Sequence, residues 1–340
     1  MLVAAPLGAV AFTLLVTSLL VAWAGAPVGR AYALLLEGGF GSRFAITETL
    51  TRATPLILTG LAAAVAFRAR LYNIGAEGQL YAGAIAAVAV GGLHGGVGFE
   101  AAPWLLFPLM VAAAMAAGAL LLLGPALMKR LGVDEVVTTL LLNFIVLLAV
   151  SALLDGPMKD PSAMGWPQSV ALQDALQLDR LIERSRVHTG LLAALGLAVA
   201  LWALLKFTTT GFEIRAVGAN ARAAAFAGMP VGWVTVKVAL LSGALAGLAG
   251  AVEVAGRAHY VTLDMSPGYG YSGIVIAMLA MLHPLSVVAA AVFVAGILVG
   301  ADSMSRAIGV PTYIADVIVS VSLIAMLVAT MLTQYRVRWR

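Results

Sequence analysis

Leu105 to Leu123 reads LLFPLMVAAAMAAGALLLL and contains no Asp, Glu, Lys or Arg. Because a transmembrane helix needs about 20 mainly apolar residues, this stretch predicts a membrane-crossing helix centred near Ala114. Comparable apolar runs are centred near Leu15, Ala62, Ala86, Phe144, Ala198, Leu245, Ile276, Val292 and Ile324. The pattern predicts an all-α, polytopic membrane protein with about ten transmembrane helices.

The composition of the whole chain favours the same class. Of its 340 residues, 62% are hydrophobic and 11% are charged, whereas about a quarter of the residues in a soluble domain are charged. This leaves little length for a soluble catalytic domain, so we treat residues 1–340 as one transmembrane domain. The net charge is +4, and the basic residues lie between apolar runs without forming a patch, which argues against nucleic-acid binding.

Several kinds of site chemistry are missing from the sequence. There is no cysteine, which excludes disulfides, thiolate metal sites and a cysteine nucleophile. No lysine follows a glycine, as the phosphate-binding loop of ATPases requires, and no His-Glu-x-x-His zinc motif occurs. We therefore expect no metal and no cofactor in this chain, and any ATP hydrolysis would occur on another polypeptide.

Basic residues orient the predicted spans, because Lys and Arg beside a span favour the cytoplasmic side. Lys129-Arg130, Arg215 with Arg222, and the tail Arg336 to Arg340 all favour the cytoplasm in one orientation. An even number of spans then places both termini in the cytoplasm. Segments placed outside also carry basic residues, and longer translocated stretches follow the rule less strictly: Arg30, Arg43, Lys159, Arg180, Arg184 and Arg186.

Two connecting segments have a distinct composition. Residues 155–187 contain three prolines and then four leucines among charged residues, which predicts a loop and a short surface helix that form an external cap. Tyr32 to Phe44 carries apolar residues suited to an interfacial position against lipid headgroups. In both cases a plain connector is the alternative.

A short helix between two spans is predicted by Gly211 to Trp233, which reads GFEIRAVGANARAAAFAGMPVGW. Asn220 is a favourable N-cap, Ala221 to Ala227 favours helix, Gly228 suits the position after the helix, and Pro230 prevents continuation. A helix this short is unstable alone in water, so it must pack against a groove or lie on lipid headgroups.

Three stretches carry a family resemblance. Ile214 to Pro230 resembles the coupling loop of permease subunits of ATP-binding-cassette importers, in the branch that carries nucleosides and simple sugars. Leu71 to Gln79, LYNIGAEGQ, resembles the break in a span of that branch. Asp134 to Asn143, DEVVTTLLLN, is similar to its Asn-Glu-Val-x-x-Thr-x-x-x-Asn helix start. Pro267 to Gly270 also follows the family order.

Two departures from the family pattern leave the solute open. Asp134 stands where Asn is usual, and Ala280-Met281 replaces a more polar pair before His283. Otherwise the resemblance covers nearly the whole chain. It implies a permease subunit that works by alternating access in a bacterial or archaeal cell membrane.

The resemblance also implies partners. These are cytoplasmic ATP-binding subunits that hold ATP and magnesium, a second permease chain that is identical or paralogous, an extracytoplasmic solute-binding protein, and membrane lipid. The cytoplasmic coupling loop would be residues 207–235. Its residues expected to serve ATPase coupling are Glu213, Arg215, Gly218, Asn220, Arg222, Phe226 and Gly228.

Polar and aromatic residues at membrane depth are candidates for the solute path, because an unpaired carboxylate there costs several kcal/mol. Hydrogen bonding within the helix bundle and anchoring at the membrane interface are the alternatives. The solute-path residues that we predict are Tyr72, Asn73, Glu77, Gln79, Asn143 and Tyr269. Further candidates are Phe144, Glu253, Tyr271 and Asp316, whereas Ser242 to Gly250 suits small-residue packing.

An internal similarity links two of these regions. A span leads into the Gly-containing break 73–79, and another leads into the Gly- and Pro-containing break 264–270. In the predicted topology the two units have opposite orientations, which is typical of an inverted repeat whose interrupted helices mark a transport path.

Two other functions remain open at this stage. One is a secondary transporter or channel, which would leave the short cytoplasmic helix without a partner. The other is an intramembrane serine protease, because Gly270-Tyr271-Ser272-Gly273 resembles the Gly-x-Ser-Gly of rhomboid proteases. That chemistry requires a base within hydrogen-bond reach of Ser272, and His283 is the histidine that follows it.

Overall fold

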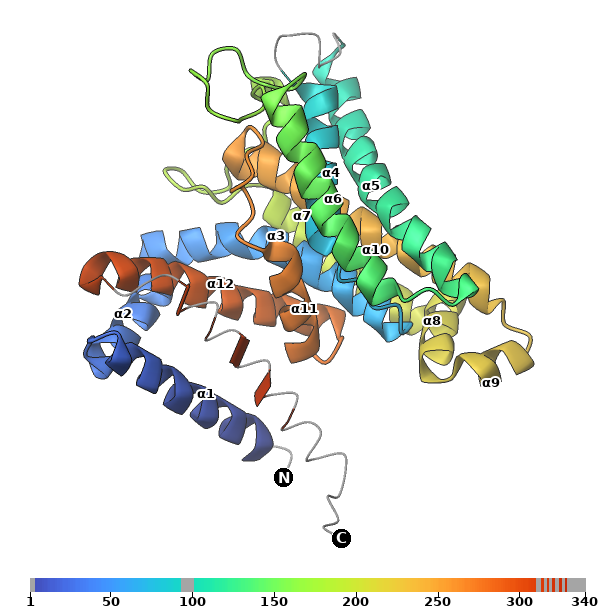
Figure 1. The fold of residues 1–340 in the computed structure, drawn as a ribbon, viewed down its shortest axis with the longest axis horizontal. Helices are drawn as coiled ribbons and strands as arrows, with labels where there is room; N and C mark the ends of the chain where they lie inside the picture. Colours follow the sequence, from blue (N-terminus) through green and yellow to red (C-terminus); the bar gives the residue numbers. More distant parts are fainter. Residues whose placement is uncertain are drawn as a thin grey trace. The chain divides into compact units, whose positions relative to one another are not determined.

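The computed structural model describes residues 4–92 and 101–309, with scattered positions between 313 and 328. These residues are helical apart from loops and isolated β-bridges, which confirms the all-α class. Asp316 and Arg336 to Arg340 lie outside the described residues, as does most of the span predicted around Ile324. The elements (Figure 1) are α1 (Ala4–Trp23), α2 (Val28–Phe40), α3 (Arg43–Arg68), α4 (Ala76–Gly91), α5 (Pro103–Met128), η1 (Lys129–Leu131), α6 (Glu135–Asp155), η2 (Asp174–Leu176), α7 (Gly190–Phe207), α8 (Thr209–Ala219), α9 (Ala221–Phe226), α10 (Val231–Glu253), the π-helical turn η3 (Val254–Ala258), α11 (Tyr269–Leu279) and α12 (Pro284–Ile308).

Six of the described helices are long and apolar enough to cross a membrane: α3, α5, α6, α7, α10 continued by η3, and α12. The pair α1 and α2, bent by 112°, makes a seventh if it is one span. Two predicted spans, α4 and α11, have 16 and 11 residues, and at about 1.5 Å per residue neither reaches across a core of about 30 Å. The chain is therefore a multi-pass membrane protein, but the predicted count of ten spans is not confirmed.

The chain forms two compact units, of which unit 1 comprises Met1–Ala53 and Ala289–Arg340. Within unit 1, α2 approaches α12 so closely that a Cβ on Gly39 would lie 2.4 Å from the Gly296 carbonyl oxygen. Arg52 forms an ion pair with Asp302 at 2.5 Å. The predicted interfacial segment Tyr32 to Phe44 is mostly helix α2, and the Tyr32 hydroxyl donates to the Leu14 carbonyl of α1 at 2.8 Å.

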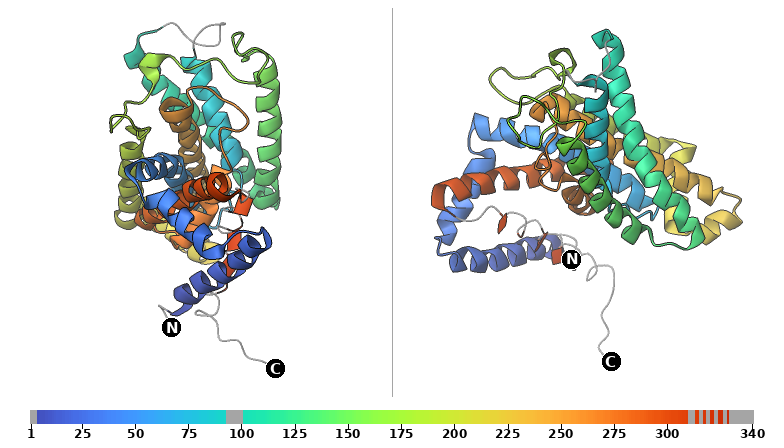
Figure 2. Two further views of the ribbon diagram at one scale, coloured as in Figure 1. Left: turned by 90° about the vertical axis from the view of Figure 1, so that its left-hand side faces the viewer. Right: turned by 45° about the horizontal axis from the view of Figure 1, so that its top comes forward.

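Unit 2, residues 54–288, is built around α4, α5 and α10, which pack side by side (Figures 1 and 2). Glycines allow these backbones to touch. A Cβ on Gly83 would lie 2.1 Å from the Gly247 carbonyl oxygen, and one on Gly118 would lie 2.2 Å from that of Gly243. Small residues give this close approach between membrane helices, so the packing role predicted for Ser242 to Gly250 is confirmed.

Residues 156–189, between α6 and α7, form a segment that we call the cap. The predicted surface helix is wrong, because the regular structure of the cap is limited to the turn η2 and isolated bridges. Leu172 and Leu176 are fully buried, and their Cδ1 atoms lie 2.8 and 2.6 Å from the position of a Cβ on Gly91, at the end of α4. The Leu172 N–H donates to the His259 carbonyl at 2.7 Å. Packing against the helix ends therefore overrides the helical tendency of this segment.

Candidate functional site

The break between α3 and α4 is shaped by its own sequence. Arg70 adopts a left-handed conformation with φ 55°, and the Leu71 N–H donates back to the Ala66 carbonyl at 3.0 Å, a common helix ending. The Asn73 Oδ1 then accepts the Gly75 N–H at 3.0 Å, just before α4 begins. These contacts turn the chain sharply at residues 69–75.

The N-termini of α4 and α11 meet at Glu77, and we call this contact the crossing. The Glu77 carboxylate is 3% exposed, and its Oε2 accepts the Gly270 N–H at 2.6 Å. A Cβ on Gly270 would lie 2.2 Å from the Glu77 backbone nitrogen, so the two backbones are in direct contact. Free N–H groups and the helix dipole make a helix N-terminus favourable for a carboxyl group, which explains how Glu77 is accommodated in the interior.

The crossing joins the two breaks that the sequence pairs. Residues of both 73–79 and 264–270 take part, and the Thr59 hydroxyl also donates to the Tyr269 carbonyl at 2.9 Å. Interrupted helices that meet in this way are the usual location of a transporter's binding region. An inverted repeat over the whole chain stays a prediction.

Asn73 and Gln79 form a reciprocal amide pair beside the crossing. Each side-chain nitrogen donates to the other's oxygen at 2.9 Å, and Asn73 Nδ2 also lies 3.1 Å from the Ser242 hydroxyl of α10. Asn73 is 0% exposed and Gln79 is 2% exposed. The pair ties the break to the middle of α10.

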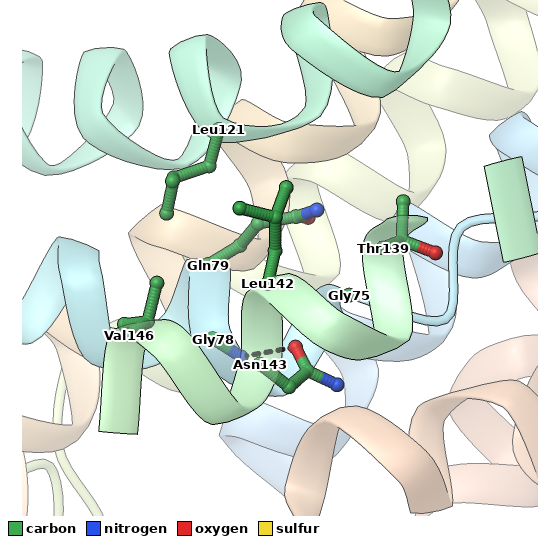
Figure 3. A pocket seen from close by; sticks show the side chains of 8 residues that line it. All are labelled: Gly75, Gly78, Gln79, Leu121, Thr139, Leu142, Asn143 and Val146. Atoms are coloured by element: carbon green, nitrogen blue, oxygen red, sulfur yellow. Dashed lines mark hydrogen bonds between the residues drawn. The ribbon is translucent and has the colours of Figure 1, made fainter. Parts of the chain in front are cut away.

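Asn143 of α6 binds the same break from the other side. Its Oδ1 accepts the Gly78 N–H at 2.8 Å, as Figure 3 shows, and its Nδ2 donates to the Ile74 carbonyl at 2.9 Å and to the Tyr271 hydroxyl at 3.0 Å. The cavity enclosed here measures about 10 Å³, room for one water molecule at most. It is lined by Gly75, Gly78, Gln79, Leu121, Thr139, Leu142, Asn143 and Val146.

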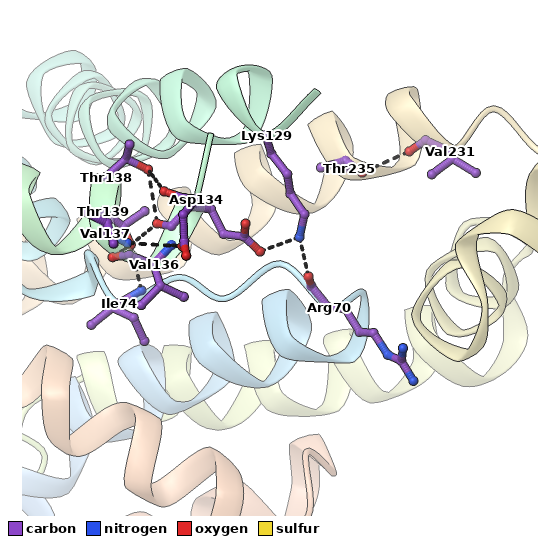
Figure 4. Close-up of polar contacts among 11 residues, drawn as sticks. Arg70, Ile74, Lys129, Asp134, Val136, Val137, Thr138, Thr139, Val231 and Thr235 are labelled. Atoms are coloured by element: carbon purple, nitrogen blue, oxygen red, sulfur yellow. Dashed lines mark hydrogen bonds and ion pairs between the residues drawn. The ribbon is translucent and has the colours of Figure 1, made fainter. Parts of the chain in front are cut away.

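An open cleft of about 420 Å³ lies at the start of α6, between Tyr72 and residues 129–136. Asp134 caps α6 by accepting the Val136 N–H at 2.7 Å. Lys129 pairs with the buried Glu135 and donates to the Arg70 carbonyl at 2.6 Å (Figure 4). These contacts fasten the start of α6 to the break.

The predicted solute-path residues do lie together around the crossing, but five of the six are buried. Tyr72 is 43% exposed and lines the cleft, whereas Tyr269 is only 1% exposed. Buried with it are Asn73, Glu77, Gln79 and Asn143. In the structure, further hydrogen-bond partners of the two breaks are Thr59, Thr139 and Ser242. The sequence does not single them out, because a single hydroxyl within an apolar run carries no distinctive signal.

Two further candidates lie elsewhere in unit 2. Glu253, at the end of α10, is fully buried and forms an ion pair with Arg257 of the turn η3. The Arg257 guanidinium also donates to the Met265 carbonyl at 3.1 Å. Phe144 of α6 is 56% exposed.

Residues 207–235 contain two helices, whereas the sequence predicts one. The first, α8, is capped by Thr208, whose hydroxyl accepts the Gly211 N–H at 3.0 Å. A Cβ on Gly218 would lie 1.8 Å from the Arg68 carbonyl oxygen, so α8 rests directly on the end of α3. Glu213 pairs with Lys237 of α10 at 3.3 Å. Glu213 and Gly218 therefore hold α8 to the body of unit 2.

The second helix, α9, has the local structure that the sequence predicts. Asn220 accepts the Ala223 N–H at 3.0 Å, and Gly228 follows the helix with φ 82°. Of the α9 residues only Ala224 is buried, and Phe226 is 97% exposed. Arg222 is also exposed, and Arg215 of α8 is half-buried. The helix thus presents its surface outward from the platform formed by α8.

The geometry argues against a serine protease. Ser272 lies in the first turn of α11, and His283 lies beyond its end at Leu279. From Ser272 to Leu279 the helix axis extends about 10 Å, well beyond hydrogen-bond reach. His283 Nδ1 lies instead 3.4 Å from the Ser286 hydroxyl.

Comparison with known proteins identifies permeases as relatives of this chain. A family described as the permease component of branched-chain amino acid transport systems matches residues 45–327. The chain is 36% identical to the guanosine ABC transporter permease protein NupP of Bacillus subtilis, covering 93% of this chain and 90% of that one. It is 37% identical to the glucose ABC transporter permease protein TsgB13 of Haloferax volcanii (90% and 82% covered) and 30% identical to the nucleoside ABC transporter permease protein NupB of Lactococcus lactis (92% and 87%).

Proposed function

Because the chain belongs to the permease family of branched-chain amino acid transport systems, we propose that it forms the membrane path of an ATP-driven importer for nucleosides or simple sugars. Its relatives NupP and NupB are named for guanosine and nucleosides, and TsgB13 is named for glucose. These names support two solute classes, of which nucleosides are represented twice. Solute would move by alternating access without covalent chemistry in this chain.

The observation that carries the proposal is the exposed surface of α9. A six-residue helix is too short to be stable alone, and α9 buries only Ala224 against unit 2. Its 97% exposed Phe226 suits an apolar groove on a partner. The platform α8 is fixed to α3 and α10, so a push on α9 would be transmitted to the spans that carry the crossing. We assign this surface to a cytoplasmic ATP-binding subunit that holds ATP and magnesium.

The cap is assigned to the opposite side of the membrane. α10 and η3 together run for 28 residues, about 42 Å, from Val231 beside α9 to Ala258 beside the cap. The basic residues Arg215, Arg222 and Lys129 lie toward the α9 end, which favours the cytoplasm. The cap and residues 260–268 would then receive solute from an extracytoplasmic binding protein. An even number of spans, as the sequence predicts, would place both termini in the cytoplasm. A second permease chain would complete the path.

The buried polar residues are assigned a positioning role. The hydrogen bonds of Asn73, Glu77, Gln79 and Asn143 join the break to α6, α10 and α11. With a cavity of about 10 Å³ beside them, they have no room for a nucleoside or sugar in this conformation. We propose that they hold the crossing while the solute passes along its exposed side.

The test is uptake by proteoliposomes that contain this chain, its ATP-binding subunit and its binding protein. Labelled nucleosides should enter only with ATP and the binding protein, and unlabelled nucleosides should compete better than pentoses or hexoses. Phe226→Asp places a charge in an apolar contact, where an unpaired charge is costly, so uptake and solute-stimulated ATP hydrolysis should be lost. Ala219→Asp, on the exposed end of α8, is the matched control. Uptake without ATP or a binding protein would instead indicate a secondary transporter or channel.

A further inference from the structure

Tyr271 differs from its neighbours at the start of α11. Tyr269, Gly270 and Gly273 are buried, whereas Tyr271 is 38% exposed. Its hydroxyl accepts a hydrogen bond from Asn143 Nδ2 at 3.0 Å, and Asn143 is 0% exposed. The hydroxyl of Tyr271 is therefore held by a buried amide, while more than a third of the residue stays accessible.

Tyr271 is linked to the neighbouring break 73–79, because Asn143 bonds to both the Ile74 carbonyl and the Tyr271 hydroxyl. Asn73 of the neighbouring break bonds to Ser242, which lies about 16 Å from Val231 along a helix of about 42 Å. Irregular backbone at such depth occurs only where it is covered by protein or lines a water-filled space. Residues 259–268 precede α11, and Pro267 is exposed and Gly268 is half-buried. The proposed path of the solute would run along the exposed side of this break, next to Tyr271.

Anchoring at the membrane interface does not explain the tyrosine. Interfacial tyrosines place the ring in the apolar zone and the hydroxyl among the headgroups. In Tyr271 the hydroxyl instead accepts a hydrogen bond from Asn143, a fully buried amide of α6. If this position only faced lipid, an apolar residue such as leucine would suffice, and the hydrogen bond from Asn143 would serve no purpose.

We infer that Tyr271 is a specificity-determining residue whose ring stacks on the planar base of a nucleoside during transport. Asn143 fixes the orientation of the ring before solute arrives, and a tyrosine has few torsions to immobilise. Stacking on an aromatic ring tolerates any base, because every base has a π-face. The buried Tyr269 cannot take this role. The inference rests on the proposed import of nucleosides and names the residue that the solute touches.

Photo-crosslinking tests this contact directly. The complete transporter, with its ATP-binding subunit and binding protein, is reconstituted in proteoliposomes and illuminated with tritiated 8-azidoguanosine during ATP-driven turnover. Mass spectrometry of the labelled peptides should place the label in the first turn of α11. Tyr271→Phe keeps the ring and should retain the label, whereas Tyr271→Leu should lower it about tenfold. Excess guanosine should compete for labelling and excess ribose should not.

Matched measurements separate the possible failures. Phe107 of α5, an aromatic residue with a similar exposed fraction of 36%, provides the control, and Phe107→Leu should leave the α11 label unchanged. If Tyr271→Leu does not assemble, the position of the label in the wild-type protein still decides the matter. Guanosine uptake by the same wild-type vesicles with the label confined to other helices would overturn the stacking role alone. Wild-type vesicles that take up no nucleoside would overturn the proposed function and this inference together.

Discussion

Two short helices of unit 2, α11 and α9, are stabilised in different ways. Neither the eleven residues of α11 nor the six of α9 can form a stable helix alone. α11 is held by a buried carboxylate at its N-terminus and by backbone contact with α4. α9 is held by its cap and by one buried alanine.

The difference separates a helix that belongs to the body of the protein from one whose surface remains available to the proposed partner. Local openings of a protein begin where few apolar contacts hold a segment. By this criterion α9 can rearrange on binding without disturbing unit 2, whereas α11 moves only if the crossing moves. Substitutions of similar chemistry should therefore have large effects on stability at α11 and small ones at α9.

The largest contrast is expected from adding one methyl group. In Gly270→Ala the new Cβ would lie 2.2 Å from the Glu77 nitrogen and 2.6 Å from the Ala76 carbonyl carbon. These are backbone atoms that cannot turn aside, so we expect a loss of about 3 kcal/mol or more. Gly228→Ala, with φ 82° and no atom within 4 Å of its Cβ, should cost about 1 kcal/mol. Thermal unfolding in detergent measures both, and equal losses would contradict the comparison.

The cap adds a third comparison, because it contains a buried histidine that has no hydrogen-bond partner among the described residues. His188 is 1% exposed, and its ring nitrogens have no hydrogen-bond partner among the described residues. Burial, with smaller contributions from His259 and Arg257, lowers the pKa of His188 to about 4 from 6.5. The unfolded chain then binds a proton more readily than the folded protein. Stability should be complete above about pH 6.5 and fall by about 3 kcal/mol as the pH approaches 4.

Thermal unfolding between pH 8 and pH 4.5 tests this dependence. His188→Gln should flatten the curve in this range. His283→Gln, at a half-buried histidine near Ser286, should keep the wild-type slope. If His188→Gln keeps that slope as well, other groups cause the pH dependence.

Removal of the carboxylate at the crossing should have the next largest effect. Glu77→Ala leaves the Gly270 N–H without its buried acceptor, which costs about 2 kcal/mol. Glu77→Gln keeps an acceptor oxygen and should cost less. If the residue positions the crossing, uptake should fall in the order wild type, Gln, Ala, in step with stability. Uptake abolished in a fully stable Glu77→Gln would favour direct contact of the carboxylate with solute, as the sequence alone suggests.

The sequence predicts the helices well and their partners less well. Apolar runs place most helices correctly, and Asn220, Gly228 and Pro230 define α9 because capping is local chemistry. The length of α4 and α11 is not predicted, since an apolar run has the same composition whether it crosses the bilayer or stops at a crossing. The sequence wrongly predicts a surface helix in the cap for a related reason, because the burial of Leu172 depends on a distant helix end.

In the candidate site, too, the sequence points to the polar residues but not to their partners. Charge and amide groups in apolar runs point to Glu77, Asn73 and Asn143, since such residues must be paired or functional at depth. The sequence cannot say which, because the partners Gly270 and Ser242 lie far along the chain. Exposure separates Tyr271 from Tyr269, which are two positions apart and indistinguishable by composition.

The smallest effect on overall stability is expected from the N-cap of α9. Asn220→Ala removes the acceptor for the Ala223 N–H, worth about 1 kcal/mol. Because α9 is held by little else, the loss should appear as local fraying, with hydrogen exchange of residues 221–226 about fivefold faster and the unfolding temperature unchanged. Asp134→Ala removes the equivalent cap from α6, a helix of 21 residues packed on the break, so the same chemical loss should lower the unfolding temperature of the whole protein. If Asn220→Ala also lowered that temperature, α9 would be part of the body, and its exposed face would no longer argue for a partner.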